Sequence, residues 1–331
     1  MSVNPSDAGL NPGGSAPAEP DFFELQVLRR QEVASGIYMF ELRHADGRVL
    51  PSFTPGAHLT VQTPSGVRRN YSLCSDPAHT GYYQIAVKRD PAGRGGSISM
   101  VDDVQVGQSI MVSAPRNNFE LSAAKSFIFV AGGIGITPIL SMMRHLKRNG
   151  GEFKLYYCTR DEASTAFKDE IETTFGSDVL IHHDRGDMNE ALDLWPVLEK
   201  PGQAHVFCCG PKGLMESVAD MSGHWPSGSV HFESFGVDAA AFAENRPLKV
   251  RLAKTGTTID VEADQTILEA LRANGLRVPS SCESGTCGSC KTRLLAGEPE
   301  HRDMVLSEDE QADHIMVCVS RAKSSELVLD L

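Results

Sequence analysis

Apolar and polar residues alternate with a period of two over the first third of the chain, after a polar start. Side chains of a β-strand point alternately to its two faces, so this period is typical of half-buried strands. Turns rich in glycine, proline and aspartate separate the stretches. Six short strands of this kind predict a small antiparallel β-barrel. The predicted strands cover residues 24–28, 36–43, 58–62, 67–73, 82–88 and 109–113.

The pattern changes at residue 122, where alternation gives way to continuous apolar runs. Residues 126–131 read SFIFVA, as expected of a strand buried on both faces, and they lead into Gly132-Gly-Ile-Gly-Ile-Thr-Pro138. Apolar residues then recur with helical spacing as far as Asn149, with Thr137 as the expected N-cap and Pro138 as the first helical residue. Further strands alternate with helices, one of them over 165–175, which predicts a parallel α/β sheet with helices on its faces.

The last third combines a hairpin, one helix and a long loop. Residues 248–263 read as the hairpin, and residues 266–274 as a helix closed by Gly275. A last strand covers 326–330, so the pattern predicts a β-grasp domain. The expected division is a disordered tail at 1–21, the barrel at 22–121, the α/β domain at 122–237, a linker at 238–247 and the β-grasp domain at 248–331.

Composition narrows the functions that such a chain can have. The 331 residues carry a net charge of −12, which argues against binding nucleic acid because phosphates would repel the protein. No apolar stretch is long enough for a membrane span, and no signal peptide is recognisable. We therefore expect a cytoplasmic protein that does not bind membranes, and a monomer because no oligomer seam is visible.

Four of the eight cysteines carry the strongest chemical signal. Cys282, Cys287 and Cys290 form a C-x4-C-x2-C run, and Cys318 follows in a separate segment. This is the spacing of a plant-type [2Fe-2S] cluster, which needs four thiolates around two irons. A structural zinc site is the alternative, although paired C-x2-C knuckles are more usual there. A disulfide framework suits a small secreted protein and not a chain of this length.

Two motifs in the predicted barrel could bind a phosphorylated, flat ligand. Arg69-Asn-Tyr-Ser72 supplies a guanidinium fork for a phosphate, an aromatic ring and a small hydroxyl. A glycine-rich loop at 90–97 could turn its backbone amides toward a phosphate. Each motif alone is equally compatible with an ordinary strand or turn.

The strand–glycine turn–helix unit at 126–149 predicts a dinucleotide site. Bare glycine backbone and a helix N-terminus allow a pyrophosphate to approach, here with the pattern G-x-G-x-x-P. Other residues at the carboxyl ends of strands should lie at the same edge: Thr159, Arg160, Asp161, Asp184, Cys209 and Gly210. His182 and His183 also end a strand but face opposite ways, so they are not expected to bind a metal together.

In this order the motifs resemble the phthalate dioxygenase reductase family of the ferredoxin–NADP reductase superfamily. The resemblance covers residues 22–331 and is closest in Ser280–Cys290 and His231-Phe-Glu-Ser-Phe-Gly236. It implies FMN in the barrel, NADH on the parallel sheet and a [2Fe-2S] cluster in the C-terminal domain.

The resemblance also implies roles for individual residues. Arg69, Asn70, Tyr71 and Ser72 would line the FMN, with Ser72 near its reactive nitrogen. Cys209 would lie beside the nicotinamide, so that Ser72 and Cys209 flank the reacting atoms. The other implied contacts are Ala86, Val87 and Lys88 with the flavin, Gly95, Gly96 and Ser97 with its phosphate, Thr137 and Phe235 with the pocket, and Gly133, Gly135, Asp161, Asp184, Gly210 and Pro211 with the nucleotide.

The implied function is an NADH-dependent oxidoreductase that passes electrons through FMN and the cluster to a terminal Rieske-type aromatic-ring oxygenase. FAD is the alternative flavin, and Arg160 would allow NADPH, although Asp161 and Asp184 would repel its 2′-phosphate. A cytochrome P450 or a diiron hydroxylase is the alternative acceptor. A zinc-stabilised binding protein without catalytic activity is the alternative of another class.

Overall fold

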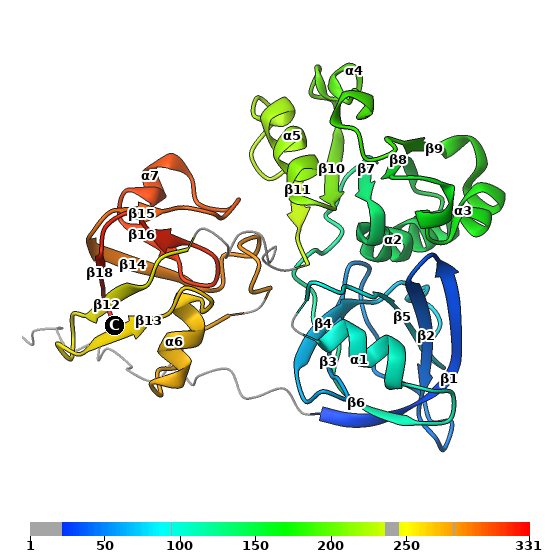
Figure 1. Cartoon of the computed structure of the whole chain (residues 1–331). Coiled ribbons are helices and arrows are strands. Elements are labelled where there is room, and N and C mark those ends of the chain that lie inside the picture. The colour runs from blue at the N-terminus through cyan, green and yellow to red at the C-terminus, as the bar shows by residue number, and fades with distance from the viewer. Residues whose placement is uncertain (1–21, 94, 236–244, 281) are drawn as a thin grey trace, which may run out of the picture.

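The computed structural model describes residues 22–93, 95–235, 245–280 and 282–331. Three large sheets follow one another along the chain, blue to cyan, green, and yellow to red in Figure 1, and β15 (Pro299–Glu300) and β17 (Arg321–Ala322) add a two-stranded sheet in the last part. The predicted tail at 1–21 and the predicted linker at 238–247, up to residue 244, lie outside the described residues. Within those residues, no helix combines the length and the apolar character needed to cross a bilayer.

The first sheet is a six-stranded antiparallel barrel in the order β4-β3-β6-β1-β2-β5. A bridge between Leu73 and Ile85 brings its two end strands together. Inward residues such as Phe40 and Leu59 are fully buried, as the period of two predicts. The strands are β1 Phe22–Ala34, β2 Ile37–Arg43, β3 His58–Gln62, β4 Arg68–Ser72, β5 Tyr83–Lys88 and β6 Ser109–Ser113.

The barrel also carries a helix that the sequence did not predict, α1 Gly96–Asp103, which lies across one side of the barrel in Figure 1. Gly95 precedes it with φ 83°, a left-handed conformation that glycine adopts without strain. Met100, Val101 and Val104 pack into the barrel core. Their helical spacing was the available signal, and the glycine-rich stretch before them concealed it.

The second sheet is parallel, with the order β11-β10-β7-β8-β9. The chain moves outward from β7 through β8 to β9 and then returns to the other side of β7, so the strand order reverses between β7 and β10. Ligands of such sheets bind at this reversal, beyond the carboxyl ends of the strands. The elements are β7 Ser126–Gly132, α2 Ile136–Asn149, β8 Glu152–Thr159, α3 Lys168–Phe175, β9 Val179–His183, α4 Trp195–Leu198, β10 Ala204–Cys209, α5 Lys212–Ser222 and β11 Val230–Glu233.

Two helix starts differ from the prediction. A 3-10 turn at Gly133–Gly135 runs directly into α2, so Gly135 and not Thr137 is the N-cap. Thr137 lies inside the first turn, where its hydroxyl donates to the Ile134 carbonyl at 3.0 Å. The predicted helix at 165–175 begins only at Lys168, because the short turn η2 Glu162–Ser164 precedes it.

The barrel and the parallel sheet share one hydrophobic core. Ile37, Cys74, Ala86 and Phe119 from the barrel side pack with side chains of β7 and of α2, including Met142. Figure 1 shows α2 between the green sheet and the barrel. The backbone amide of Ser35 also donates to the Ala163 carbonyl at 2.8 Å. These contacts fix the carboxyl edge of the parallel sheet against the barrel.

The third sheet is mixed, in the order β13-β12-β18-β14-β16, and packs against α6 around its own core. Thr266 caps α6 with Glu269 in a reciprocal capping box, and Gly275 with φ 79° follows its end, as predicted. The elements are β12 Leu248–Leu252, β13 Thr258–Val261, α6 Ile267–Ala273, β14 Lys291–Ala296, β15 Pro299–Glu300, α7 Glu308–Gln311, β16 His314–Met316, β17 Arg321–Ala322 and β18 Glu326–Leu329.

Candidate functional site

Strand β4, at one end of the barrel's strand order, carries the predicted flavin motif. Ser72 is buried, and Tyr71 is partly buried. The Tyr71 hydroxyl is buried and finds no hydrogen-bond partner within the described residues. Burial raises the pKa of Tyr71 to about 12, and the positive charge of Arg69 opposes the shift. An unpaired buried hydroxyl is costly, so this position fits a polar ligand that would complete the hydrogen bond.

Arg69 and the glycine-rich loop come together, as a phosphate site requires. A Cβ on Gly96 would lie 3.1 Å from the Arg69 Cγ, so the arginine stem packs directly on this glycine. Gly95 and Gly96 begin α1, whose first amides have no side-chain cap. Ser97 accepts a hydrogen bond from the Asp90 amide at 3.2 Å. A guanidinium beside a helix N-terminus is a suitable pair of donors for a phosphate.

The three predicted flavin contacts on β5 point in different directions. Val87 belongs to the barrel core, whereas Ala86 faces the core shared with the parallel sheet. Lys88 is exposed. A flavin at this strand would therefore meet the Ala86 side chain but only the backbone of Val87.

The glycine turn and the Cys209-Gly210-Pro211 segment meet at the strand-order reversal. A Cβ on Gly135 would lie 2.1 Å from the Cys209 carbonyl oxygen, and one on Gly210 would lie 2.9 Å from the Gly132 Cα. Only bare backbone allows this approach. The predicted nicotinamide residues Gly133, Gly135, Cys209, Gly210 and Pro211 thus lie around one point at the N-terminus of α2.

A carboxyl group that sequence reasoning did not select joins the barrel to this point. Ser72 on β4 donates to the Glu233 Oε2 at 3.4 Å, across 161 residues of sequence. Burial raises the pKa of Glu233 to about 8; the Ser72 hydrogen bond opposes the shift, and the negative charge of Cys282 adds to it. Burial and the Glu233 charge also raise the pKa of Cys209, which is therefore a neutral thiol. Apart from the resemblance, the only signal for Glu233 was an acidic residue at the end of an apolar strand.

Phe235 follows two residues after Glu233 and is 46% exposed. A ring this exposed is not part of a hydrophobic core. Its place in the sequence, two residues from Glu233, fits the implied contact with the flavin pocket.

The charged residues predicted for the far end of the nucleotide lie at the ends of β8 and β9. Asp161 caps η2, where its carboxylate accepts from the Ser164 amide at 2.8 Å, and hydrogen bonds from Ser164 lower its pKa. Asp184 accepts from the Gly186 amide at 2.8 Å. A Cβ on Gly186 would lie 3.4 Å from the Arg160 Nε, so Arg160 shares this edge with both acids.

The two neighbouring histidines do not form a pair, as predicted. The His182 Nε2 lies 2.6 Å from the Glu190 carbonyl oxygen, whereas the His183 Nδ1 lies 2.9 Å from the Thr159 hydroxyl.

The four predicted cluster cysteines gather at one end of the third sheet as two pairs of free thiols. A hydrogen bond with Cys287 lowers the pKa of Cys282, and a hydrogen bond with Cys318 lowers that of Cys290. No group of three or more His, Cys, Asp or Glu side chains in the described part of the chain could hold a single metal ion. Two pairs of thiols suit two irons with two thiolates each.

Backbone amides also turn toward the cysteine sulfurs. The Ser284 amide donates to the Cys282 Sγ, and the Cys282 amide donates to the Cys287 Sγ, both at 3.4 Å. Gly285 and Gly288 adopt φ 78° and 76°, which the curled loop requires. Such N–H donors stabilise thiolates and tune the potential of a cluster.

The cysteine loop lies beside the flavin pocket. The charge of Cys282 acts on Glu233 and also on His58, the cross-strand partner of Ser72. Burial lowers the pKa of His58 to about 4, helped by the Arg116 charge, and the Cys282 charge opposes the shift. The flavin and nicotinamide sites therefore meet at Ser72 and Glu233, and the charge of Cys282 acts on the same point.

Comparison with known proteins agrees with this arrangement. Residues 24–121 match the oxidoreductase FAD-binding domain model, 129–220 the oxidoreductase NAD-binding domain model and 250–323 the 2Fe-2S iron–sulfur cluster binding domain model. The chain is 59% identical over 314 residues to the phthalate 4,5-dioxygenase oxygenase reductase subunit of Pseudomonas putida, covering 94% of this chain and 97% of that protein. It is 56% identical over 321 residues to phthalate dioxygenase reductase of Burkholderia cepacia, covering 96% of this chain and all of that protein.

The chain belongs to the phthalate dioxygenase reductase family. A solved phthalate dioxygenase reductase, described as a modular structure for electron transfer from pyridine nucleotides to [2Fe-2S], matches it with a TM-score of 0.76 at 56% identity, over 94% of this chain and 98% of that one. The predicted fold class is confirmed: a flavin domain, an NAD domain and a 2Fe-2S domain follow in this order. Members of this family are oxidoreductases, and the prediction of an enzyme is confirmed with it.

Replacing Gly135 with alanine should test the close approach at the strand-order reversal. The new Cβ would lie 2.1 Å from a backbone oxygen, so the turn or β10 must shift. We expect a loss of about 1–3 kcal/mol in the free energy of unfolding and slower flavin reduction by NADH. Urea unfolding and stopped-flow absorbance measure the two effects.

Gly213→Ala is the matched control, because nothing lies within 4 Å of its new Cβ and Gly213 is inside α5. It should leave flavin reduction unchanged and stabilise the protein by about 0.5–1 kcal/mol. Equal effects of the two variants would contradict the predicted contact.

Glu233→Gln should change how stability depends on pH. The folded protein keeps the Glu233 proton up to about pH 8, whereas the unfolded chain releases it near its usual pKa of 4.5. Wild type should therefore lose stability, relative to the variant, as the pH rises from 5 to 8.5, by at most about 5 kcal/mol. Urea midpoints at both pH values measure the difference, and a difference that stays constant with pH would contradict the buried neutral carboxyl.

Proposed function

We propose that this chain takes electrons from NADH and passes them through FMN and a plant-type [2Fe-2S] cluster to a terminal Rieske-type aromatic-ring oxygenase. The observation that carries the proposal joins three segments: Ser72 donates a hydrogen bond to Glu233, and the charge of Cys282 acts on the same carboxyl group. Each segment comes from a different cofactor domain. Electron transfer requires short distances between cofactors, so their domains must approach each other. A binding protein without catalytic activity would not need this approach.

FMN is favoured over FAD by the compact phosphate cradle. Arg69, Gly95, Gly96 and Ser97 gather at the first turn of α1 and could hold one terminal phosphate. The Tyr71 hydroxyl would complete its hydrogen bonds with the polar chain of the flavin, and Ala86 would contact the ring system. When bound, the flavin would supply the exchange between two-electron nicotinamide chemistry and one-electron cluster chemistry.

The residues around the reacting atoms would bind and orient rather than donate electrons. Ser72 would present its hydroxyl to the flavin, and the neutral thiol of Cys209 would pack beside the nicotinamide. Gly133, Gly135 and Thr137 would leave the first amides of α2 available to the pyrophosphate. Phe235 would shield the flavin face until the nicotinamide enters.

NADH is favoured over NADPH by charge at the far end of the site. Asp161 and Asp184 lie at the edge that the adenosine ribose would reach, and both carboxylates would repel a 2′-phosphate. Arg160 could offset this repulsion, but its one positive charge lies beside two negative charges, so the net charge at this edge is negative.

Cys282, Cys287, Cys290 and Cys318 would hold the cluster, two thiolates to each iron. Rieske centres have higher potentials than plant-type clusters, so electrons would pass to such an acceptor with a favourable free energy.

The relatives named above are reductases of a phthalate dioxygenase, which supports an oxygenase as the partner. We propose that the chain acts as a cytoplasmic monomer.

Cys318→Ser tests the route. Loss of one of four thiolates should prevent the cluster from carrying electrons while NADH still reduces the flavin. Anaerobic mixing with a purified phthalate-class Rieske oxygenase, followed by its visible absorbance, measures the transfer. Cys158→Ser, outside the four cysteines, is the control and should transfer as wild type does. Transfer by the Cys318 variant at the wild-type rate would exclude the proposed route.

A further inference from the structure

The guanidinium of Arg144 on α2 joins both halves of the flavin–nicotinamide module. Its Nε and Nη2 donate to Glu170 Oε1 at 2.9 and 2.5 Å. Its Nη1 donates to the Cys74 carbonyl at 2.5 Å and to Gln84 Oε1 at 3.1 Å. The Arg144 side chain is only 16% exposed, so solvent screens these contacts weakly.

The partners of Arg144 lie next to the predicted cofactor contacts. Cys74 comes two residues after Ser72 at the end of β4, and Gln84 comes two residues before Ala86 on β5. Glu170 belongs to α3, on the side of the parallel sheet. One side chain thus ties both flavin-lining strands to the helix whose first turn lies at the nicotinamide site.

The face of α2 that carries Arg144 continues to that first turn. Thr137, Ser141 and Arg144 recur at i, i+4 and i+7, which places them on one side of the helix. All the residues from Ile136 to Met143 are buried. A displacement of α2 at Arg144 would therefore move Thr137 with it, because the helix between them is rigidly packed.

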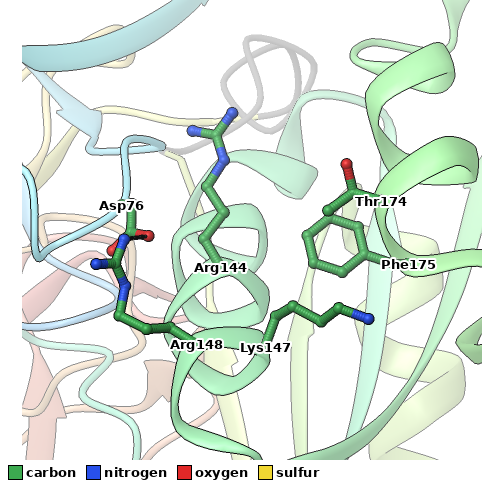
Figure 2. Close-up of a pocket in the computed structure, with 6 residues that line it drawn as sticks. All are labelled: Asp76, Arg144, Lys147, Arg148, Thr174 and Phe175. Carbon is green, nitrogen blue, oxygen red and sulfur yellow. Dashed lines mark hydrogen bonds and ion pairs between the residues drawn. The ribbon is translucent and has the colours of Figure 1, made fainter.

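A second arginine of α2 repeats the link one turn further on. Arg148 pairs with Asp76, the second residue after Cys74, and Figure 2 shows this pair beside Arg144. Lys147 lies in the same view, lining the pocket at this junction together with Phe175. Lys147 is exposed, and within the described residues it has no hydrogen-bond or ion-pair partner.

We propose that Arg144 is a positioning residue for hydride transfer, holding the nicotinamide end of α2 at a fixed distance from the flavin-lining strands. When bound, the flavin would accept a hydride, one proton with two electrons, from NADH, and NAD⁺ would remain. The inference rests on the proposed function. Arginine suits the role because its planar fork can serve Glu170, Gln84 and a carbonyl at once, which a lysine ammonium cannot do in the same geometry.

The experiment compares Arg144→Lys, Arg144→Gln and Lys147→Gln in the full chain with its cofactors. Stopped-flow absorbance at increasing NADH separates the limiting rate of flavin reduction from the dissociation constant of NADH. Both Arg144 variants should lower the limiting rate by about 10- to 100-fold, because small misplacements of reacting groups have effects of this size. The dissociation constant should change less than about threefold, because Arg144 lies two turns from the predicted nucleotide contacts. Lys147→Gln should match wild type.

Arg144→Lys separates position from charge. It keeps the positive charge and loses the fork, so a purely electrostatic role predicts wild-type rates in this variant. Wild-type rates in either Arg144 variant would overturn the proposal, and so would equal losses in the Lys147 control. If the wild-type protein did not reduce its flavin with NADH, that result would contradict the proposed function itself. Loss of the Arg144 effect alone would contradict only the positioning role.

Hydrogen–deuterium exchange gives a second readout that does not depend on turnover. Amides at 74–76 and 84–86 should exchange faster in Arg144→Gln than in Lys147→Gln. If Arg144→Gln does not fold, Gln84→Ala removes only one partner and should give a smaller loss of rate in the same direction. Unchanged exchange together with an unchanged rate in Gln84→Ala would contradict the link.

Discussion

Apolar side chains from the barrel and from the parallel sheet pack into one shared core, and the relative position of the flavin and nicotinamide sites depends on it. Ile37, Ala86 and Phe119 enter this core from the barrel, and Ile139 and Met142 enter it from α2. Separate cores would let the two domains move independently. A shared core fixes the carboxyl edge of the sheet against β4 and β5, so Ser72 can meet Glu233.

The residues at the contact between Ser72 and Glu233 are buried and hold mainly neutral groups. Burial lowers the pKa of His58 to about 4 and raises that of Glu233 to about 8, so both are uncharged near pH 7. Cys209 is a neutral thiol for the same reason. Charges interact more strongly where water is excluded. Neutral His58, Glu233 and Cys209 therefore add no side-chain charge of their own near this contact.

Local patterns predicted most of the elements, with α1 as an exception, but not the partners of the elements. Alternation identified the six barrel strands, and glycine chemistry identified the turn before α2. The C-x4-C-x2-C spacing identified the cysteine loop. Glu233 and Arg144 could not be recognised in this way, because their roles depend on contacts with Ser72 and with Cys74 that only the strand order creates.

The errors of the prediction have the same origin. Threonine is a common N-cap residue, which led to the prediction for Thr137, but the 3-10 turn before α2 shifts the N-cap to Gly135. Helix α1 is short, and its apolar residues follow a stretch of glycines that favours a loop. In both places, packing against the shared core or the barrel core decided between two locally acceptable conformations.

The most direct test of the account is the visible spectrum of the purified protein before and after anaerobic addition of NADH, with the released flavin identified by chromatography and the iron counted. The account predicts one FMN and two irons per chain, and bleaching of both the flavin and the cluster absorbance by NADH. A colourless protein that contains zinc would contradict it, as would a flavin that NADH reduces while the cluster stays oxidised.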